Sequence, residues 1–301
     1  MATAVEPPIT SMAFSPDTQT IVVGSQVGVE VYTWPMLTLQ RRIEVAARNI
    51  HDLEFSPSGS QLAVGSGTPA EEGVVELFSW PDGQAVKSLT GHKDSVMAVA
   101  WRDGSSLVSA SLDRSITVWD TRAGSITRVL EGHSRGVSSV CFLKDRRILV
   151  SAGIDRSLRV WNAEISAQPT AAQSLLHSLD NHTRRVHALA LRPGVGGMPM
   201  VASASKDRTV RLWQPTIGRM LRFVRLEAEP LDIEWVPDGS KIVAACSDGH
   251  VRVIDPDAVK VTLDLPTIDS WAYALAVHPT DGSVAVGGRH GQVRRVVLAV
   301  R

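Results

Sequence analysis

Three stretches of the chain share one pattern of residues, and this repetition constrains the fold more than any other feature. In each stretch an Asp follows a His after 21 to 25 residues, and a Trp stands six residues beyond the Asp. A unit that recurs at this length indicates a repeat architecture, in which each unit forms one small supersecondary element. The three sets are His92, Asp113 and Trp119; His133, Asp155 and Trp161; and His182, Asp207 and Trp213.

A second marker extends the count of units to both flanks of the chain. It is an apolar segment that ends in a large residue before a turn rich in Pro, Asp or Gly, and it recurs at spacings of 41 to 49 residues. Seven units then account for residues 1–301, which we expect to form a single domain. The markers are Phe14, Phe55, Trp101, Phe142, Leu191, Trp235 and His278, and the units should begin near residues 9, 50, 96, 137, 186, 230 and 273.

Within a unit, short segments of alternating apolar and polar residues are separated by Gly, Pro, Asp or Ser, a pattern typical of β-strands. The third unit predicts strands at residues 96–101, 107–111, 116–120 and 125–130. Each unit is therefore expected to be a sheet of four short strands, and the chain to be all-β.

The repeats with their Trp-Asp endings resemble the WD-repeat (Trp-Asp repeat) family, and the resemblance spans residues 1–301. It implies a seven-bladed β-propeller, in which four-stranded antiparallel sheets stand radially around a channel. It also implies that, within each blade, the turn Asp accepts a hydrogen bond from the His, the His reaches a Ser on the second strand, and this Ser meets the Trp indole. The implied sets are His92/Ser109/Asp113/Trp119, His133/Ser151/Asp155/Trp161 and His182/Ser203/Asp207/Trp213.

The recurrence of these sets argues against a hydrolytic triad, because a nucleophile needs an exposed cleft and an oxyanion site rather than one copy per sheet. We interpret the sets as structural, since each buried polar group left unpaired costs roughly 1–3 kcal/mol. The other four units lack the full set; unit six keeps Asp248 but has Ile254 in the Trp position. His51 and His187 alone provide too few ligands for a metal. We therefore expect no catalytic residue, cofactor or metal. We also expect one half of the ring to carry the hydrogen-bonded sets and the other half to lack them.

The last unit has too few residues after its third strand to form a fourth. Residues 292–299 predict its third strand, so the fourth would have to come from residues 2–6, which precede Pro7 and Pro8. Pro cannot donate to a strand ladder, so this segment makes at most a short strand. Three interpretations follow: a short N-terminal strand completes the blade, the native chain has been trimmed, or the open edge accepts a strand from a partner.

Charge and cysteine content bear on partners and compartment. Lys and Arg number 31, as do Asp and Glu, so no global field attracts nucleic acid. Cys141 and Cys246 fall in units that are not neighbours, which argues against a disulfide between them. No segment has the pattern of a signal peptide or the ~18–20 apolar residues of a membrane span. We therefore expect a soluble, cytoplasmic protein.

In the family that the chain resembles, the binding surface usually lies on the face carrying the loops into each first strand, and on the rim of the channel. Alignment on the turn markers places Thr10, His51, Met97, Ser138, His187, Leu231 and Ala274 at equivalent positions early in the first strands. Exposed Trp, Met, Leu, Ile and Arg on such a face have the composition of an interface hot spot. The candidate partner-binding residues are His51, Met97, Leu112, Ile154, Arg184, Arg185, His187, Lys206, Trp271 and Arg289.

The function favoured by these patterns is a non-catalytic scaffold that binds a protein segment or peptide on this loop face, as a monomer or as a subunit of a larger assembly. The alternative is a histone-binding or nucleic-acid-binding propeller, indicated by Arg184, Arg185, Lys206 and Arg208 in one unit. A propeller-based enzyme is a third class, but it would need titratable groups outside the structural sets.

Overall fold

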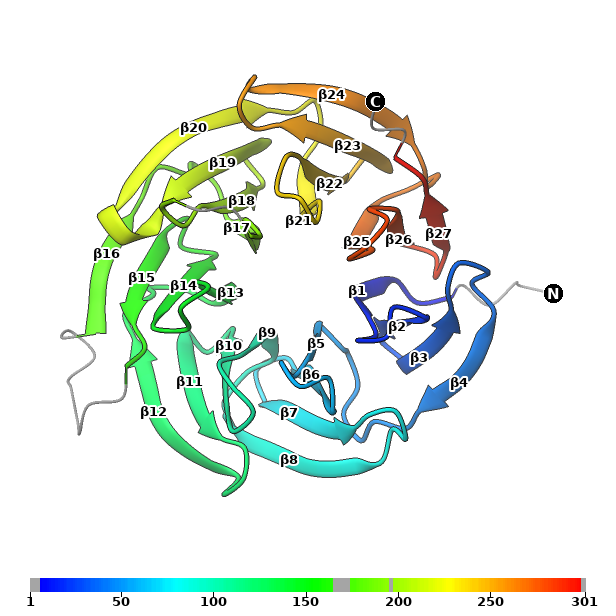
Figure 1. Ribbon diagram of the computed structural model, residues 1–301. Coiled ribbons are helices and arrows are strands. Elements are labelled where there is room, and N and C mark those ends of the chain that lie inside the picture. Colours follow the sequence, from blue (N-terminus) through cyan, green and yellow to red (C-terminus); the bar gives the residue numbers. More distant parts are fainter. Residues whose placement is uncertain (1–5, 165–173, 195–196, 299–301) are drawn as a thin grey trace.

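The computed structural model describes residues 6–164, 174–194 and 197–298, and these form a ring of seven antiparallel sheets, or blades, around a central channel (Figure 1). In every blade, strands that follow one another in sequence are hydrogen-bonded neighbours, from the innermost strand outward. Blades 1 to 6 have four strands, and the described part of blade 7 has three. The predicted seven-bladed β-propeller is confirmed.

The first three blades contain twelve strands, and in blade 3, whose strand limits the sequence predicted, every limit lies within one residue of its prediction. These strands are β1 (Ile9–Phe14), β2 (Thr20–Ser25), β3 (Gly28–Thr33) and β4 (Leu39–Ile43) in blade 1; β5 (Asp52–Phe55), β6 (Gln61–Thr68), β7 (Glu72–Ser79) and β8 (Ala85–His92) in blade 2; and β9 (Val96–Trp101), β10 (Ser106–Ser111), β11 (Ser115–Asp120) and β12 (Ser125–Glu131) in blade 3.

The remaining blades repeat this order, with one short 3-10 helix, η1 (Pro215–Ile217), between two strands of blade 5. Their strands are β13 (Val137–Phe142), β14 (Ile148–Gly153), β15 (Leu158–Asn162) and β16 (Leu175–Leu179) in blade 4; β17 (Val186–Leu191), β18 (Val201–Ser205), β19 (Thr209–Gln214) and β20 (Arg219–Arg225) in blade 5; β21 (Pro230–Trp235), β22 (Ile242–Cys246), β23 (His250–Asp255) and β24 (Lys260–Pro266) in blade 6; and β25 (Ala272–Val277), β26 (Val284–Gly288) and β27 (Val293–Val296) in blade 7.

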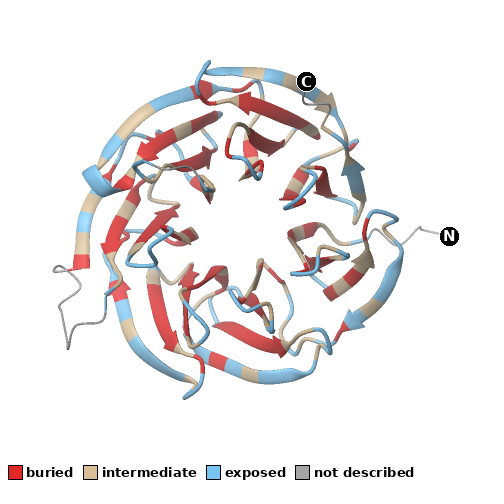
Figure 2. Cartoon of the chain, viewed as in Figure 1, coloured by how far each residue is buried: buried red, intermediate tan, exposed pale blue. Residues whose placement is uncertain are grey.

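The second strand of each blade is covered on both faces by the neighbouring blades. All residues of β10 are buried, whereas the outermost strand β24 alternates between exposed and half-buried positions. Figure 2 shows the same gradient around the ring, with buried residues on the inner strands and exposed ones on the outermost strands. A strand covered on both faces carries small and apolar residues at successive positions rather than in alternation, and β10 (SLVSAS) fits this pattern.

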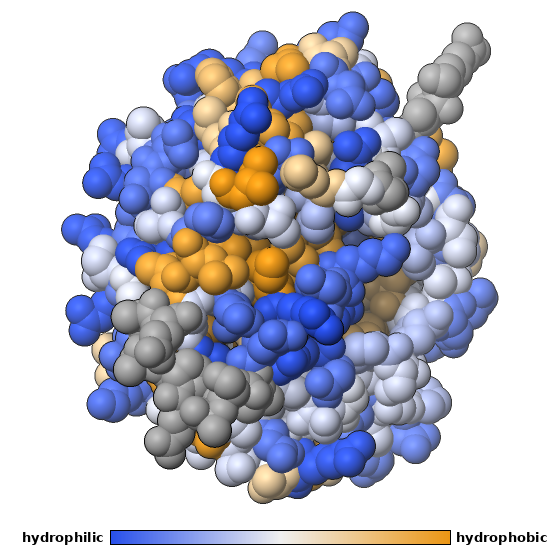
Figure 3. All heavy atoms as spheres, turned by 60° about the vertical axis from the view of Figure 1, so that its left-hand side comes forward, coloured by the Kyte–Doolittle hydropathy of each residue, from blue (hydrophilic) through white to orange (hydrophobic). Residues whose placement is uncertain are grey.

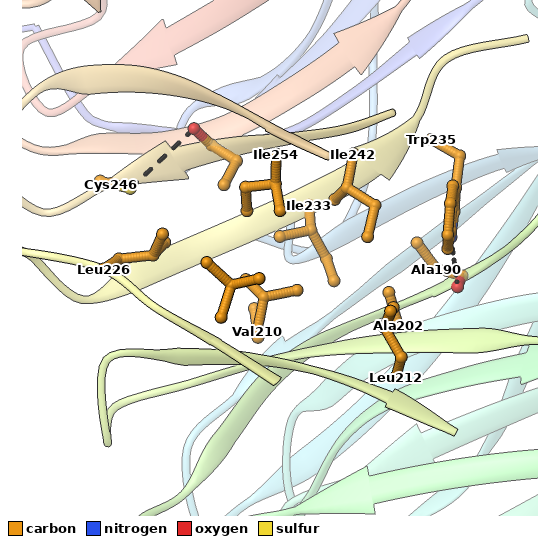
Figure 4. Packing of buried hydrophobic residues seen from close by; sticks show 13 residues of the cluster. Ala190, Ala202, Val210, Leu212, Leu226, Ile233, Trp235, Ile242, Cys246 and Ile254 are labelled. Carbon is orange, nitrogen blue, oxygen red and sulfur yellow. Dashed lines mark hydrogen bonds between the residues drawn. The ribbon is translucent and has the colours of Figure 1, made fainter. Parts of the chain in front are cut away.

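Apolar contact between blades holds the ring together, as blades 5 and 6 illustrate. Val210 and Leu212 of blade 5 belong to one buried cluster with Ile233 of blade 6 (Figure 4). In the same cluster the Trp235 indole donates to the Ala190 carbonyl at 3.1 Å, so its one polar atom is paired across the blade boundary. Burial of this kind contributes about 25 cal/mol per Å² of apolar surface removed from water.

Blades 7 and 1 meet through side chains in the described residues. Trp34 of blade 1 stacks on His278 at 6.0 Å, and the Arg295 guanidinium of β27 lies 5.6 Å from the Trp34 ring. The strand predicted at 292–299 is shorter, as β27, and within the described residues its only neighbour in the sheet is β26. Residues 2–5 of the predicted N-terminal strand lie outside the described residues. Within the described part of the chain, the last blade therefore ends at β27.

Candidate partner-binding site

Three polar networks contain the residues that recur in the sequence. In the second network along the chain, His133 Nδ1 lies 2.9 Å from Asp155 Oδ2, and His133 Nε2 lies 2.7 Å from Ser151 Oγ. Trp161 Nε1 donates to the same Ser151 oxygen at 2.8 Å. The two equivalent networks join His92, Asp113, Ser109 and Trp119, and His182, Asp207, Ser203 and Trp213.

Each network ties two blades together, which corrects the implied arrangement within single blades. His92 ends β8, the outermost strand of blade 2, whereas Trp119 belongs to β11 of blade 3. His133 and His182 likewise follow the outermost strands of blades 3 and 4. The chain leaves one blade at its outer strand and crosses to the inner strand of the next, and the His on this crossing reaches into the blade that follows.

The directions of the bonds follow from the chemistry of the groups. An indole nitrogen can only donate, so Ser151 accepts from Trp161 and gives its own hydrogen to His133, which in turn donates to Asp155. Burial alone would raise the pKa of Asp155, but hydrogen bonds from His133 and Ser157 outweigh it and hold that pKa well below its usual range. Because Ser151 is fully buried, its hydroxyl is closed to a substrate. The network is structural.

Blade 6 contains a different network, which sequence analysis missed. Arg252 of β23 is 2% exposed and donates from Nη1 and Nη2 to the two oxygens of Asp248, at 3.0 and 2.7 Å. Its Nε donates to Asp264 of β24 at 3.1 Å, and Asp264 also lies 2.6 Å from His250 Nδ1. The planar guanidinium can bridge two carboxylates at once. Blade 6 therefore has a polar network of its own, although it lacks the full set of His, Ser, Asp and Trp.

Backbone bulges mark one rim of the channel. In six of the first strands the pairing with the second strand shifts by one residue, and the extra residue is left without a partner in the ladder. Bulges of this kind re-aim a side chain. Together with the residue before β5, these residues line a hollow of about 730 Å³: Thr10, His51, Met97, Ser138, His187, Leu231 and Tyr273.

Tyr273, and not Ala274, occupies this position in blade 7. The alignment used His278 as the turn marker, but β25 ends one residue earlier, at Val277. His278 is the first residue of the turn, where its Nδ1 lies 3.2 Å from the Asp281 amide nitrogen. A shift of one residue along a strand moves a side chain to the opposite face, which is why Ala274 is buried and Tyr273 lines the channel.

Four carboxylates line the channel wall in blades 2 and 6. Each accepts a backbone N–H from the first strand of the next blade, so the pairs act as bridges between blades. The bonds are Asp52 to Val99 at 2.8 Å, Glu54 to Trp101 at 2.7 Å, Asp232 to Leu275 at 2.8 Å and Glu234 to Val277 at 2.6 Å.

Burial in the channel wall desolvates these carboxylates and raises their pKa values. The pKa is raised to about 6 for Asp52 and to about 7 for Asp232. It is raised to about 8 for both Glu54 and Glu234. In each case desolvation outweighs the backbone hydrogen bonds, which act in the opposite direction.

We expect the ring to lose stability as the pH rises through the pKa values of Glu54 and Glu234. Both folded-state values, about 8, lie above the ordinary value of 4.5, so their contribution is complete below that ordinary value and is lost as the pH rises through about 8. Glutamine keeps an oxygen that accepts from the neighbouring amide and cannot ionise. The double variant Glu54→Gln/Glu234→Gln should therefore melt above the wild type at about pH 9, with no difference near about pH 4.

The control for this measurement is Glu71→Gln/Glu131→Gln, which alters two exposed carboxylates. Thermal melts of all three proteins across the pH range give the comparison. A gap between the channel variant and the wild type that stayed constant with pH would show that these two glutamates do not titrate as described.

Two of the predicted residues, Trp271 and Arg289, are exposed at the rim of blade 7, where they form a group with the half-buried Tyr273. Trp271 is 41% exposed, and its ring centroid lies 5.6 Å from that of Tyr273. The Arg289 guanidinium lies 5.8 Å from the centroid of the Trp271 ring. We call Trp271, Tyr273 and Arg289 the aromatic rim. Sequence analysis identified Trp271 and Arg289 and missed Tyr273.

Other predicted residues are less exposed to solvent. His187 Nε2 lies 2.5 Å from Glu229 Oε1, while Met97 and His51 are half-buried in the channel wall. Leu112 packs over Gly136 so closely that a Cβ there would lie 2.8 Å from its Cδ2. His51 and His187 do not belong to any group of three metal-ligating side chains in residues 6–164, 174–194 and 197–298.

The remaining predicted residues gather in a second hollow, between blades 4 and 5. Ile154, Arg184, Arg185 and Lys206 line it together with Arg135 and Arg156, which sequence analysis did not select. We call the hollow lined by Arg135, Arg156, Arg184, Arg185 and Lys206 the basic cleft. Figure 3 turns the side of the ring that carries β12 to β16 forward and shows strongly hydrophilic side chains gathered beside apolar ones.

Comparison with known proteins identifies similar repeats. The WD40 family profile, described as "WD domain, G-beta repeat", matches residues 83–120, 124–162, 173–214 and 227–255. The first three matches each begin in the outermost strand of one blade, or just before it, and end in the third strand of the next. The sequence repeat is thus offset from the blade, as the positions of the His residues require.

Among its relatives, the chain is 30% identical over 223 residues to the nuclear distribution protein PAC1 of Coccidioides posadasii, covering 69% of this chain and 45% of that protein. It is 28% identical over 283 residues to the anaphase-promoting complex subunit cdc20 of Dictyostelium discoideum, covering 91% of this chain and 54% of that protein. The chain spans about half the length of these relatives. In its described part, no helix has the length and apolar character that crossing a membrane requires.

Proposed function

The chain belongs to the WD-repeat β-propeller family, and we propose that it is a non-catalytic scaffold that binds a protein segment on its loop face and channel rim. The observation that carries the proposal is the aromatic rim, where the exposed Trp271 ring contacts the tilted ring of Tyr273 and the guanidinium of Arg289. Trp, Tyr and Arg are the residue types that contribute most to binding in protein interfaces.

The polar residues that recur in the sequence are already engaged in structure. His, Ser and Asp of each set bond to one another, and the channel carboxylates accept amide hydrogens from the next blade. What remains on the loop face is contact surface with aromatic, aliphatic and cationic side chains. This division supports binding rather than chemistry as the role of the ring.

Two further features belong to the proposal. The relative from Dictyostelium discoideum is named as a subunit of a complex, which supports a place for this chain in a larger assembly. Cys141 and Cys246 are both free thiols in the structure, which is the usual state in a reducing compartment. We therefore place the scaffold in the cytoplasm.

The double variant Arg185→Ala/Trp271→Ala tests the proposed face. Both side chains are exposed, so the free energy of unfolding should change by no more than about 0.5 kcal/mol. Capture of the partner should fall, because truncation of a hot-spot aromatic costs about 2 kcal/mol or more of binding free energy. The measurement is a pull-down with quantitative mass spectrometry on wild type and variant.

The matched control is Phe223→Ala/Arg225→Ala, which removes an aromatic ring and an Arg from the outermost strand β20. Phe223 is 43% exposed, close to the 41% of Trp271. Partners that are lost from the loop-face variant and kept by the control support the proposal. Equal loss from both, or from neither, would move the site to another part of the ring.

A further inference from the structure

We infer that the basic cleft binds the phosphoryl group of a phosphorylated protein segment. The inference rests on the proposed function and specifies the chemistry of its partner. The cleft is a hollow of about 570 Å³ lined by Arg135, Arg156, Arg184, Arg185 and Lys206. Such a concentration of cations is local, because the whole chain has 31 basic and 31 acidic residues.

The cations of the cleft are held without acidic partners. Among the described residues, Arg135, Arg156, Arg184 and Lys206 take part in no ion pair within 4.0 Å, and Arg185 reaches only Glu229, at 4.0 Å. Some arginines elsewhere on the molecule are paired, as Arg42 is with Glu30 at 2.8 Å. Unpaired like charges around one hollow repel one another, and a bound anion would relieve that repulsion.

The one carboxylate in the cleft is already committed. Asp155 accepts from His133, from the amide of Ser134 and from the hydroxyl of Ser157. These bonds belong to the network that joins blades 3 and 4, and the single negative charge of Asp155 offsets only one of the five cations of the cleft. The cleft keeps a net positive charge while the ring stays intact.

The cleft is built from corresponding positions of two successive blades, which gives it a rigid base. Ser134 and Thr183 each follow the His of a network, and Ile154 and Lys206 each precede its Asp. Their backbones are fixed by bonds such as Thr183 N–H to Asp207 at 3.1 Å and Lys206 N–H to the Arg185 carbonyl at 3.0 Å. Hydroxyl and guanidinium groups placed on such a frame can contact several phosphoryl oxygens at once.

The position of the cleft fits a ligand that also touches the channel rim. Arg185 lies at the cleft and reaches Glu229, which in turn binds His187 at the channel. A peptide that crosses the rim could therefore place one modified residue in the cleft, beside the apolar side chain of Ile154. A phosphoryl group adds a charge of about −1.5 to −2 and three acceptor oxygens, which suits a compact group of arginines.

A nucleic acid fits these observations less well. Its affinity depends on neutralising many phosphates along an extended track. The other Arg-rich element of blade 5, β20 with Arg219, Arg222 and Arg225, is the outermost strand of its sheet, and Arg222 there donates to the Asp257 carbonyl at 3.0 Å. The cleft is a single compact site, which matches one phosphoryl group on a peptide.

The test uses the full chain and an arrayed peptide library in two forms, one with a central phosphoserine or phosphothreonine and one unphosphorylated. We expect binding to the phosphorylated form at least about tenfold tighter for the best sequences, with affinity falling as salt rises. The variant Arg184→Gln/Lys206→Gln should lose at least about tenfold of this affinity. The control Arg219→Gln/Arg225→Gln, which removes the same charge from β20, should keep it.

The outcomes separate this inference from the proposed function. If the phosphorylated and unphosphorylated peptides bind equally, and this binding still depends on Trp271, the inference is overturned and the scaffold function is retained. Failure of every peptide would count against both. A single-stranded RNA probe of mixed sequence is included in the same test. If this probe binds more tightly than the phosphopeptides, and Arg184→Gln/Lys206→Gln loses that binding, the ligand of the cleft is a nucleic acid and the inference is overturned.

Discussion

Replacing Arg252 with methionine is expected to lower the free energy of unfolding by about 3 kcal/mol. The guanidinium is 2% exposed and holds Asp248 through two bonds and Asp264 through one. Its removal leaves the Asp248 and Asp264 carboxylates without the guanidinium that bridges them. Their side chains are 35% and 38% exposed, so water recovers part of the loss and keeps the effect at the low end for a broken buried pair. Urea unfolding at neutral pH measures it.

Two companion variants show whether charge is the cause. Arg252→Lys keeps the charge but cannot bridge both carboxylates, so it should recover only part of the loss. The triple variant Arg252→Met/Asp248→Asn/Asp264→Asn removes the uncompensated carboxylates and should be more stable than Arg252→Met alone. If the triple variant is less stable than the single one, the Arg acts through packing and not through its ion pairs.

The Arg252 network also shows what sequence reasoning can and cannot find in a repeat protein. The sets of His, Ser, Asp and Trp are visible because they recur at nearly constant spacing, and the fold follows from that repetition. In blade 6 a polar network within the blade is formed by Arg252 with Asp264, a residue of the outermost strand. No repeated pattern marks that pair, although Asp248 and Arg252 stand four residues apart.

The candidate site was less predictable than the fold for two physical reasons. A one-residue error in a turn marker exchanged Tyr273 for Ala274, because a strand alternates its faces at every residue. The basic cleft combines Arg135 and Arg156 of one part of the chain with Arg184, Arg185 and Lys206 of another. Only the docking of adjacent blades brings these segments together, so a count of charges along the sequence does not reveal the group.

Replacing Asp155 with alanine is expected to lower the free energy of unfolding by about 2–4 kcal/mol at neutral pH. The change leaves the His133 ring N–H, the Ser134 amide and the Ser157 hydroxyl without their acceptor. Asp155→Asn should cost less, because its amide oxygen still accepts one of these hydrogens. Asp180→Ala, at an exposed position, is the control and should stay within about 0.5 kcal/mol of the wild type.

The pH dependence of this difference identifies its origin. The folded-state pKa of Asp155 lies below its usual value, so the contribution is complete above the unfolded value of about 3.9 and is lost as the pH falls through the folded one. The gap between wild type and Asp155→Ala should therefore narrow in acid. Capture that depends on Trp271 should persist in the variant, because the aromatic rim belongs to blade 7 and Asp155 to blade 4. Loss of an activity without loss of stability would instead make Asp155 a functional residue, and the structural interpretation of all three networks would then be wrong.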